Sequence, residues 1–242
     1  MNNFSKYAGT FLLIFSLIFG ACRTEPIEQN PDTTISAFNN DAESYFIDSV
    51  TGTSMMKIHT NKGYMIVDSG MGNCIFKNNQ FELKLPSSVN LQRLQNPDLT
   101  HCPNLYVSDT LFRTTSRINI CAFSKGKNCG RFVLTNLTKE LYCDEKTLDY
   151  TEVFYLYVDR PVEIRGNYCQ QKNNAEYLYN YNLIFRKGWN TLCCSAKSIS
   201  PNSVEINYNS NEIPVDVNWI YIDNSILKPT NIFSNKSFKI NI

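Results

Sequence analysis

The sequence has few of the residues on which common enzyme mechanisms depend. Only two histidines, His59 and His101, occur in 242 residues, which leaves little room for a serine or cysteine triad or for a mixed zinc site. A Gly-x-Ser-x-Gly elbow, a His-Glu-x-x-His pair, a phosphate-binding glycine loop and a dinucleotide fingerprint are all missing. The sequence therefore predicts no catalytic residues, no cofactor and no metal site, and a protein that is not an enzyme.

An excess of charge is missing as well. The chain has 23 basic and 22 acidic side chains, for a formal net charge of +1. A near-neutral chain has no long-range attraction for phosphate, which argues against a nucleic-acid partner. A hydrophobic content of 43% and an aromatic content of 13% exclude a disordered chain. Beyond the N-terminal region, no segment is apolar and long enough to span a membrane.

The N-terminus carries an export signal. Lys6 precedes an apolar run of about a dozen residues, and Gly20 and Ala21 then lead directly to Cys22. This pattern predicts a signal peptide over residues 1–21. The small-small-Cys ending resembles the lipobox of bacterial lipoproteins, with Phe19 where leucine is usual, as in the looser lipobox of Bacteroidetes. The resemblance implies that Cys22 is lipidated and that acyl chains on it hold the protein in a membrane.

The lipobox resemblance also implies a location. We expect a protein anchored by lipid in the bacterial outer membrane, and the sequence leaves open whether it faces the periplasm or the cell surface. Residues 22–43 begin with a polar stretch containing Pro26 and Pro31, which predicts a flexible tether. Cleavage removes Lys6 and leaves a net charge of zero, so membrane attachment depends on the acyl chains.

From about residue 44 onward, apolar and polar residues alternate with the period of a β-strand. Residues 151–158 are apolar on both faces, which is typical of a central strand. The pattern predicts an all-β fold, an antiparallel β-sandwich with an Ig-like or transthyretin-like two-sheet architecture and little helix. One short helix is expected over 88–94. The alternating segments are 81–85, 118–122, 162–164, 204–208, 215–221 and 238–242.

The domain organisation has two readings. The stretch 96–103 contains two prolines and no alternation, so it could separate a small β lobe, 44–97, from a larger sandwich lobe, 98–242. A lobe of about 50 residues buries little core alone and would pack on its neighbour. Residues 44–242 could equally form one continuous domain.

Three segments carry a second resemblance. They are Gly72 with Phe81-Glu-Leu-Lys-Leu-Pro86, the strand-like 154–166, and 179–190, which ends in Arg-Lys-Gly-Trp-Asn. Together they resemble uncharacterised Bacteroidetes outer-membrane lipoproteins over about 120 residues. The resemblance implies a β fold and an envelope location, and it implies no activity. The Lys187-Gly188 dipeptide is also a turn signal, which predicts a hairpin with Trp189 at the start of the return strand.

Eight cysteines remain after Cys22 is set aside. An even number in an exported domain predicts disulfides. Adjacent Cys193 and Cys194 should point to opposite faces of a strand, and one of them could bridge to Cys169. Cys121 could pair with Cys129 or with Cys143. No Cys-x2-Cys spacing supports a zinc site. The eight are Cys74, Cys102, Cys121, Cys129, Cys143, Cys169, Cys193 and Cys194.

Two further patterns bear on function. Asp68-Ser69-Gly70 follows an apolar strand and resembles the active-site turn of aspartic proteases, although a plain hairpin turn is the simpler interpretation. Tyr177, Tyr179 and Tyr181 share one face of a strand. If exposed, this row could form a platform for a ligand, and if buried, it belongs to the core.

The hypothesis from sequence is a lipid-anchored protein of the cell envelope with a structural or binding role and a protein or glycan partner. One alternative is a glycan-binding lipoprotein that aids polysaccharide uptake through the tyrosine platform. The other is an aspartic-type hydrolase that uses Asp68. The sequence does not indicate the oligomeric state.

Overall fold

The computed structural model describes residues 34–39, 46–60, 63–97, 99, 102, 104–144, 149–172 and 174–225. Within this range, the side chains of residues 56–60 and 63–69 are outside the description. The predicted signal peptide, Cys22 and the alternating segment 238–242 lie outside the described residues.

The fold is all-β and sandwich-like, with two packed sheets, as the alternation predicts. The strands are β1 (Thr34–Phe38), β2 (Ser49–Thr60), β3 (Gly63–Ile75), β4 (Gln80–Lys84), β5 (Tyr106–Val107), β6 (Ile118–Ser124), β7 (Lys127–Thr135), β8 (Tyr150–Val158), β9 (Val162–Lys172), β10 (Ala175–Phe185), β11 (Gly188–Ser200), β12 (Ser203–Ser210) and β13 (Asn218–Asp223). A 3-10 turn, η2 (Leu91–Arg93), and a short helix, α2 (Lys139–Cys143), complete the described elements.

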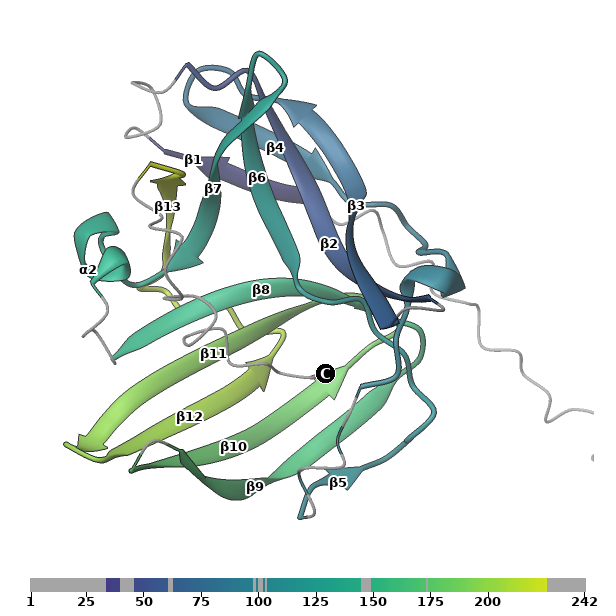
Figure 1. The fold of residues 1–242 in the computed structure, drawn as a ribbon, viewed down its shortest axis with the longest axis vertical. Coiled ribbons are helices and arrows are strands. Elements are labelled where there is room, and N and C mark those ends of the chain that lie inside the picture. The colour runs from purple at the N-terminus through teal and green to yellow at the C-terminus, as the bar shows by residue number, and fades with distance from the viewer. Residues whose placement is uncertain are drawn as a thin grey trace, which may run out of the picture.

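The strands form two bodies that meet along β7 and β8 (Figure 1). In the first body, β3, β2, β6, β7 and β13 are neighbours in that order, and the two-stranded sheet β1–β4 packs on them. Leu83 of β4, Val50 of β2 and Ala122 of β6 have no exposed surface and form the centre of this core. Alternate positions of β1 and β4 are buried, which follows from the period of two in a strand.

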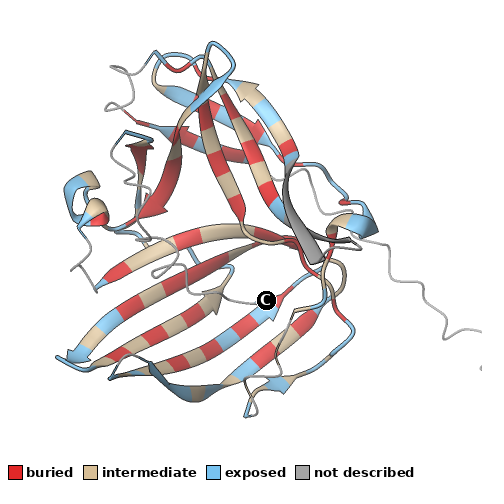
Figure 2. Cartoon of the chain, viewed as in Figure 1, coloured by how far each residue is buried: buried red, intermediate tan, exposed pale blue. Residues whose placement is uncertain are grey.

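In the second body, the order is β8-β11-β12-β10-β9-β5. One face of this sheet is apolar along every long strand, with Ile164, Leu183 and Ile206 fully buried. Figure 2 shows the alternation of buried and more exposed residues along these strands. Phe112, from the segment before β6, is also fully buried in this core.

The prediction of a hairpin at Lys187-Gly188 is wrong. The turn occurs, and Gly188 adopts a positive φ of 106°. However, β10 and β11 do not pair, because β12 lies between them and runs parallel to β10. Near the turn, hydrogen bonds of the Asn190 side chain take the place of strand pairing between β10 and β11. Its amide donates to the carbonyls of Arg186 and Gly188, and its oxygen accepts from the Arg186 N–H. Among the described strands, the pair β10–β12 is parallel and every other pair is antiparallel.

Two strands share one edge of β7. Its first part pairs with β6, as far as Ile120 opposite Phe132. On that register Ile118 would lie opposite Leu134, but Leu134 pairs with Val153 of β8 instead. On its other edge, β7 pairs with β13 from Gly130 to Thr135. The beginning of β6 and the middle of β8 therefore diverge from a common strand.

The structure corrects several boundaries. Residues 34–38, expected in the tether, form β1 and pair with β4. The helix expected over 88–94 is reduced to η2, where the Asn90 side chain accepts from the Gln92 N–H. The helix α2 was not expected, and Thr138 caps it by accepting from the Leu141 N–H. Sheet pairing crosses residue 97, because β2 pairs with β6.

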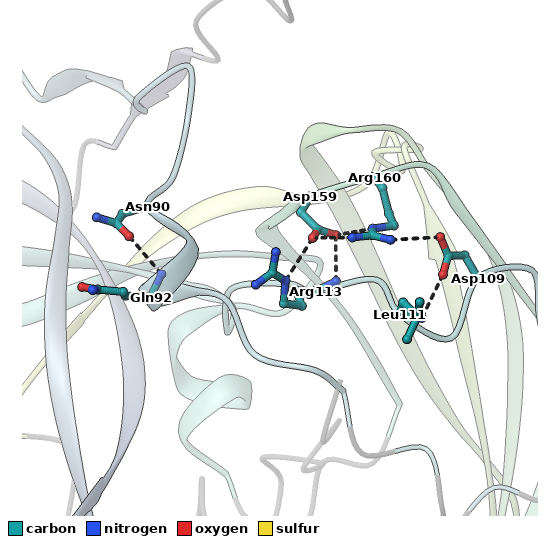
Figure 3. Close-up of polar contacts among 7 residues, drawn as sticks. All are labelled: Asn90, Gln92, Asp109, Leu111, Arg113, Asp159 and Arg160. Atoms are coloured by element: carbon teal, nitrogen blue, oxygen red, sulfur yellow. Dashed lines mark hydrogen bonds and ion pairs between the residues drawn. The ribbon is translucent and has the colours of Figure 1, made fainter.

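The turn between β8 and β9 is fixed by Asp159, whose side chain is 8% exposed. Its carboxylate accepts from the Arg113 backbone N–H at 2.8 Å, from Arg113 Nε at 3.1 Å and from Arg160 Nε at 3.3 Å. Arg160 also reaches Asp109 at 3.5 Å (Figure 3). Burial by itself raises the pKa of Asp159, but the bonds from Arg113 and Arg160 outweigh it and lower the pKa below its ordinary value.

We predict that Asp159→Asn lowers the free energy of unfolding by about 1–3 kcal/mol near neutral pH, because the Arg113 N–H and the two guanidinium groups lose the charged acceptor that they share. The lowered folded-state pKa means that the ionised carboxylate stabilises the fold above its ordinary pKa of 3.8, and that this stabilisation disappears as pH falls through the folded-state value. Urea unfolding of wild type and variant should therefore differ near neutral pH and converge in acid. Asp109→Asn, at a half-exposed carboxylate, is the matched control and should have a small effect on the free energy of unfolding. If both variants lose the same free energy of unfolding, Asp159 does not have the stabilising role described here.

Gly72 should be intolerant of any side chain. It lies beside a bulge at Met71, has a φ of +141°, and an added Cβ would be 2.5 Å from the Lys84 carbonyl oxygen. We predict that Gly72→Ala destabilises the protein by at least about 2 kcal/mol. Gly70→Ala is the control, because a Cβ there meets nothing within 4 Å, and its effect should stay within about 0.5 kcal/mol. Thermal unfolding of the two variants checks both values.

Candidate functional site

The divergence of β6 and β8 from β7 opens a cleft, which we name the junction cleft. It has a volume of about 30 Å³, which is room for about two water molecules. It lies where the two bodies meet, a common position for ligand sites. Its lining residues are Arg117, Ile118, Asn119, Ile120, Arg131, Phe132, Val133, Leu134, Tyr142, Glu152, Val153, Phe154, Tyr155 and Trp219.

Charged side chains from three segments line the junction cleft. Arg117 directly precedes β6, Arg131 lies in β7 opposite Cys121, and Glu152 lies in β8 opposite Thr135. The Nε and Nη2 atoms of Arg131 are buried. Two guanidinium groups against one carboxylate give this cleft a formal excess of one positive charge. Because the surroundings are partly apolar, that charge is screened less than it would be on an open surface.

Glu152 and Arg117 are each held by a contact within the cleft. The Tyr142 hydroxyl, from α2, donates to Glu152 Oε1 at 3.4 Å. Burial raises the pKa of Tyr142 well above its ordinary value, and the neighbouring Glu152 raises it further, so the hydroxyl stays protonated and remains a donor. The Arg117 guanidinium lies over the Phe154 ring, 4.9 Å from its centroid.

Aromatic side chains form the rest of the cleft wall. Tyr155 of β8 and Trp219 of β13 are half-buried and come from opposite sides of β7. The Trp219 ring packs against the Phe81 ring in an edge-on arrangement, with the two ring centroids 5.9 Å apart. Tyr155 is three residues from Glu152 along β8, and Trp219 lies opposite Leu134, three residues from Arg131 along β7. Because side chains alternate along a strand, these two rings face the first core, on the other side of the sheet from Arg131 and Glu152.

The tyrosine row does not form an open platform. Tyr179 and Tyr181 are each 8% exposed, and only Tyr177 is half-buried at the end of the row. Their rings stack with neighbours from other strands: Tyr179 on Tyr168 at 4.6 Å, and Tyr181 on Tyr208 at 5.0 Å. The row is part of the second core. This arrangement provides stacking energy within the protein rather than a surface for a sugar ring.

No disulfide joins the eight cysteines, all of which lie in the described residues. As expected, Cys193 and Cys194 face opposite sides of β11, and they pack in different cores. The bridge to Cys169 is excluded by strand order, because β12 and β10 separate β11 from β9 and the backbones are then about 14 Å apart. Cys169 Sγ donates to Glu176 Oε1 at 3.2 Å.

The prediction that Asp68 and Ser69 form a turn is wrong. Asp68 and Ser69 lie inside β3, opposite Met55 and Ser54 of β2. Their side chains are outside the described part, as is that of His59, and His101 is outside it altogether. The backbone thus gives no support to an aspartic-protease turn. Among the described residues, no group of three or more His, Cys, Asp and Glu side chains could hold a metal ion.

Sequence reasoning missed the cleft residues, although one signal was present. Arg131 directly precedes the apolar run Phe132-Val-Leu of β7, and a charged residue beside such a run, on a strand that both faces of the fold cover, needs a partner. Arg117 and Glu152 gave no such signal, because each occupies an ordinary polar position in its own segment.

Comparison with known proteins gives no relative: no family model, no curated protein and no solved structure matches the chain. In the part of the chain that the structure describes, no helix has the length and apolar character needed to cross a membrane.

The stacked tyrosines should resist ionisation. Burial raises the pKa of Tyr168 to about 12 and also raises the pKa values of Tyr179 and Tyr181. Because the ordinary value is about 10, the protonated tyrosines stabilise the fold fully below that pH, and this stabilisation is lost as pH rises through the folded-state values.

We therefore predict that alkaline unfolding begins above about pH 10 and that tyrosinate absorbance from these residues rises together with loss of structure. Tyr168→Phe should remove one late-titrating group from the absorbance curve. The prediction fails if all tyrosines ionise near their ordinary pKa while the far-ultraviolet circular dichroism stays native.

Proposed function

We propose that the protein is a lipid-anchored binding protein of the bacterial outer membrane and not an enzyme. The observation that carries the anchor is the Gly20-Ala21-Cys22 sequence at the end of a short apolar run. Eleven residues, 23–33, lie between Cys22 and Thr34, the first residue of β1, so twelve Cα–Cα steps join the two. Fully extended, such a segment spans about 40 Å, so the β domain would stay close to the membrane that holds its acyl chains.

The binding role is supported by the junction cleft. It is lined by residues of five elements, α2, β6, β7, β8 and β13, and of the segment before β6, and the charged Arg117, Arg131 and Glu152 are among them. The polysaccharide-uptake alternative depends on an exposed tyrosine platform, and burial of Tyr179 and Tyr181 removes its support. The aspartic-type hydrolase depends on a turn at Asp68, and the position of Asp68 within β3 removes that support.

We predict that globomycin, which blocks lipoprotein signal peptidase, causes the uncleaved precursor to accumulate in the native host. Lipidation of Cys22 is the reason, because that peptidase acts only on lipid-modified precursor. Metabolic labelling with a palmitate analogue, followed by electrophoresis, detects both the label and the mass of the chain.

Cys22→Ser is the test variant and should lose the label and the membrane fraction together. Cys169→Ser, at an exposed cysteine of the folded part, is the matched control and should keep both. Normal processing of wild type under the drug, with no label on Cys22, would refute the anchor.

A further inference from the structure

Three connections of the first body meet at the end of it that lies away from the second body (Figure 1). They are joined by backbone hydrogen bonds: the Asp48 N–H donates to the Phe123 carbonyl, and the Phe76 N–H donates to the Asp48 carbonyl, both at 3.0 Å. We name this end the tip. It comprises the segment that leads into β2, the end of β3 with its turn to β4, and the β6–β7 turn, which are residues 46–48, 75–79 and 123–128.

The tip exposes large apolar side chains. Phe46 is 86% exposed, more than any other aromatic side chain of the described residues, and Ile75 is 76% exposed. Ser49 lies opposite both Ile75 and Phe123, so the side chains of these three residues share the outer face of β3, β2 and β6. Exposed apolar groups that are gathered in one place and bordered by polar residues mark an interaction surface.

The backbone at Phe46 supports a role for its ring. Its φ is +50°, and Asn78, Asn79 and Lys125 of the same tip have φ values of +51°, +61° and +50°. This left-handed conformation is uncommon and costly for a bulky aromatic residue. Asparagine or glycine would adopt it at a lower cost. A phenylalanine that keeps this conformation while its ring is exposed therefore points to a use for the ring outside the fold.

Three lysines border the apolar groups. Lys77 lies in the turn after β3, and Lys125 and Lys127 lie in the β6–β7 turn, all three exposed. A lysine can lay its alkyl stem along an apolar surface and keep its ammonium group in a polar layer. An exposed apolar centre with a lysine border therefore matches the boundary between the acyl chains and the headgroups of a bilayer.

Acidic residues occur at the tip as well. Asp48 is the acid among the tip residues, and its carboxylate accepts from the Lys125 backbone N–H at 2.6 Å and from the Ser49 hydroxyl at 2.8 Å. Asp41 and Glu43 precede the tip in the sequence and lie outside the described residues. The attraction to a bilayer is therefore assigned to the apolar side chains and not to net charge, and neutral lipid should suffice.

The position of β1 allows the tip to reach the membrane. Thr34, the first residue of β1, lies opposite Lys84 of β4. The Lys84 carbonyl lies against Gly72, where an added Cβ would be 2.5 Å from it, and Gly72 is three residues from Ile75 along β3. Two strand spacings and three residues of strand amount to about 20 Å. The segment from Cys22 to Thr34 spans about 40 Å when extended, which exceeds that separation.

We propose that the tip inserts into the lipid bilayer that holds the acyl chains of Cys22. Phe46 and Ile75 enter the boundary between acyl chains and headgroups, and the three lysines stay in the headgroup layer. The second body then faces away from the membrane. This assignment rests on the lipid anchor proposed above, and the experiment reads the anchor and the insertion separately.

The experiment uses the full mature chain, purified with its lipid and reconstituted in neutral phosphatidylcholine vesicles whose acyl chains are either plain or brominated. Bromine quenches indole fluorescence on contact. Phe46→Trp and Ile75→Trp each place an indole at the tip. Ile199→Trp is the matched control, because Ile199 is 57% exposed near the end of β11, in the second body (Figure 1). Wild type supplies the background emission of Trp189 and Trp219.

Relative to this background, we expect the added emission of Phe46→Trp and of Ile75→Trp to shift to shorter wavelength on reconstitution. It should also be weaker in brominated than in plain vesicles. The added emission of Ile199→Trp should be the same in both kinds of vesicle. Thermal unfolding verifies that each variant is folded, and the two tip positions are independent, so either one carries the test if the other variant does not fold.

Mass spectrometry of the same samples reports on the anchor. If Cys22 carries lipid and neither folded tip variant is quenched, the anchor stands and this inference is overturned, and the apolar patch belongs to a protein partner instead. If Ile199→Trp is quenched as strongly as the tip variants, the molecule lies along the membrane and the inference is also overturned. A chain without lipid on Cys22 refutes the anchor, and the inference with it.

Discussion

The structure depends on a single strand edge that two strands share. β6 uses the first part of one edge of β7, and β8 takes that edge over at Leu134. A backbone edge supplies one hydrogen-bonding partner at each position, so the two strands cannot both continue. Their divergence turns one continuous hydrogen-bonded network into two bodies with separate cores. Contacts of Tyr157 and Trp189 with the first core, from strands of the second body, keep the two together.

The same divergence explains why charged groups occur at the centre of the molecule. Where β6 and β8 separate, Leu134 pairs with Val153 of β8 and not with β6. Arg117, Arg131 and Glu152 are among the residues that line the cleft at this point. Charged groups that are partly withdrawn from water need favourable contacts. Here the Tyr142 hydroxyl donates to Glu152, and the Arg117 guanidinium lies over the Phe154 ring.

The sequence predicted the strands well and their arrangement poorly. Alternation around Phe81 and Leu83, and around Val204, Ile206 and Tyr208, identified β4 and β12, because a period of two is a local property. The parallel pairing of β10 with β12 and the shared edge of β7 depend on long-range contacts, which local periodicity does not encode. The helix α2 is only five residues long, too short for a helical period to appear. The cleft combines residues 117, 131 and 152, so no motif joins them in the sequence.

The central claim is that β6 and β8 share one edge of β7, and an experimental structure of the full chain tests it most directly. We predict that Ile120 lies opposite Phe132 and that Leu134 pairs with Val153 of β8. A β6 that continues along β7 to pair Ile118 with Leu134 would contradict the account.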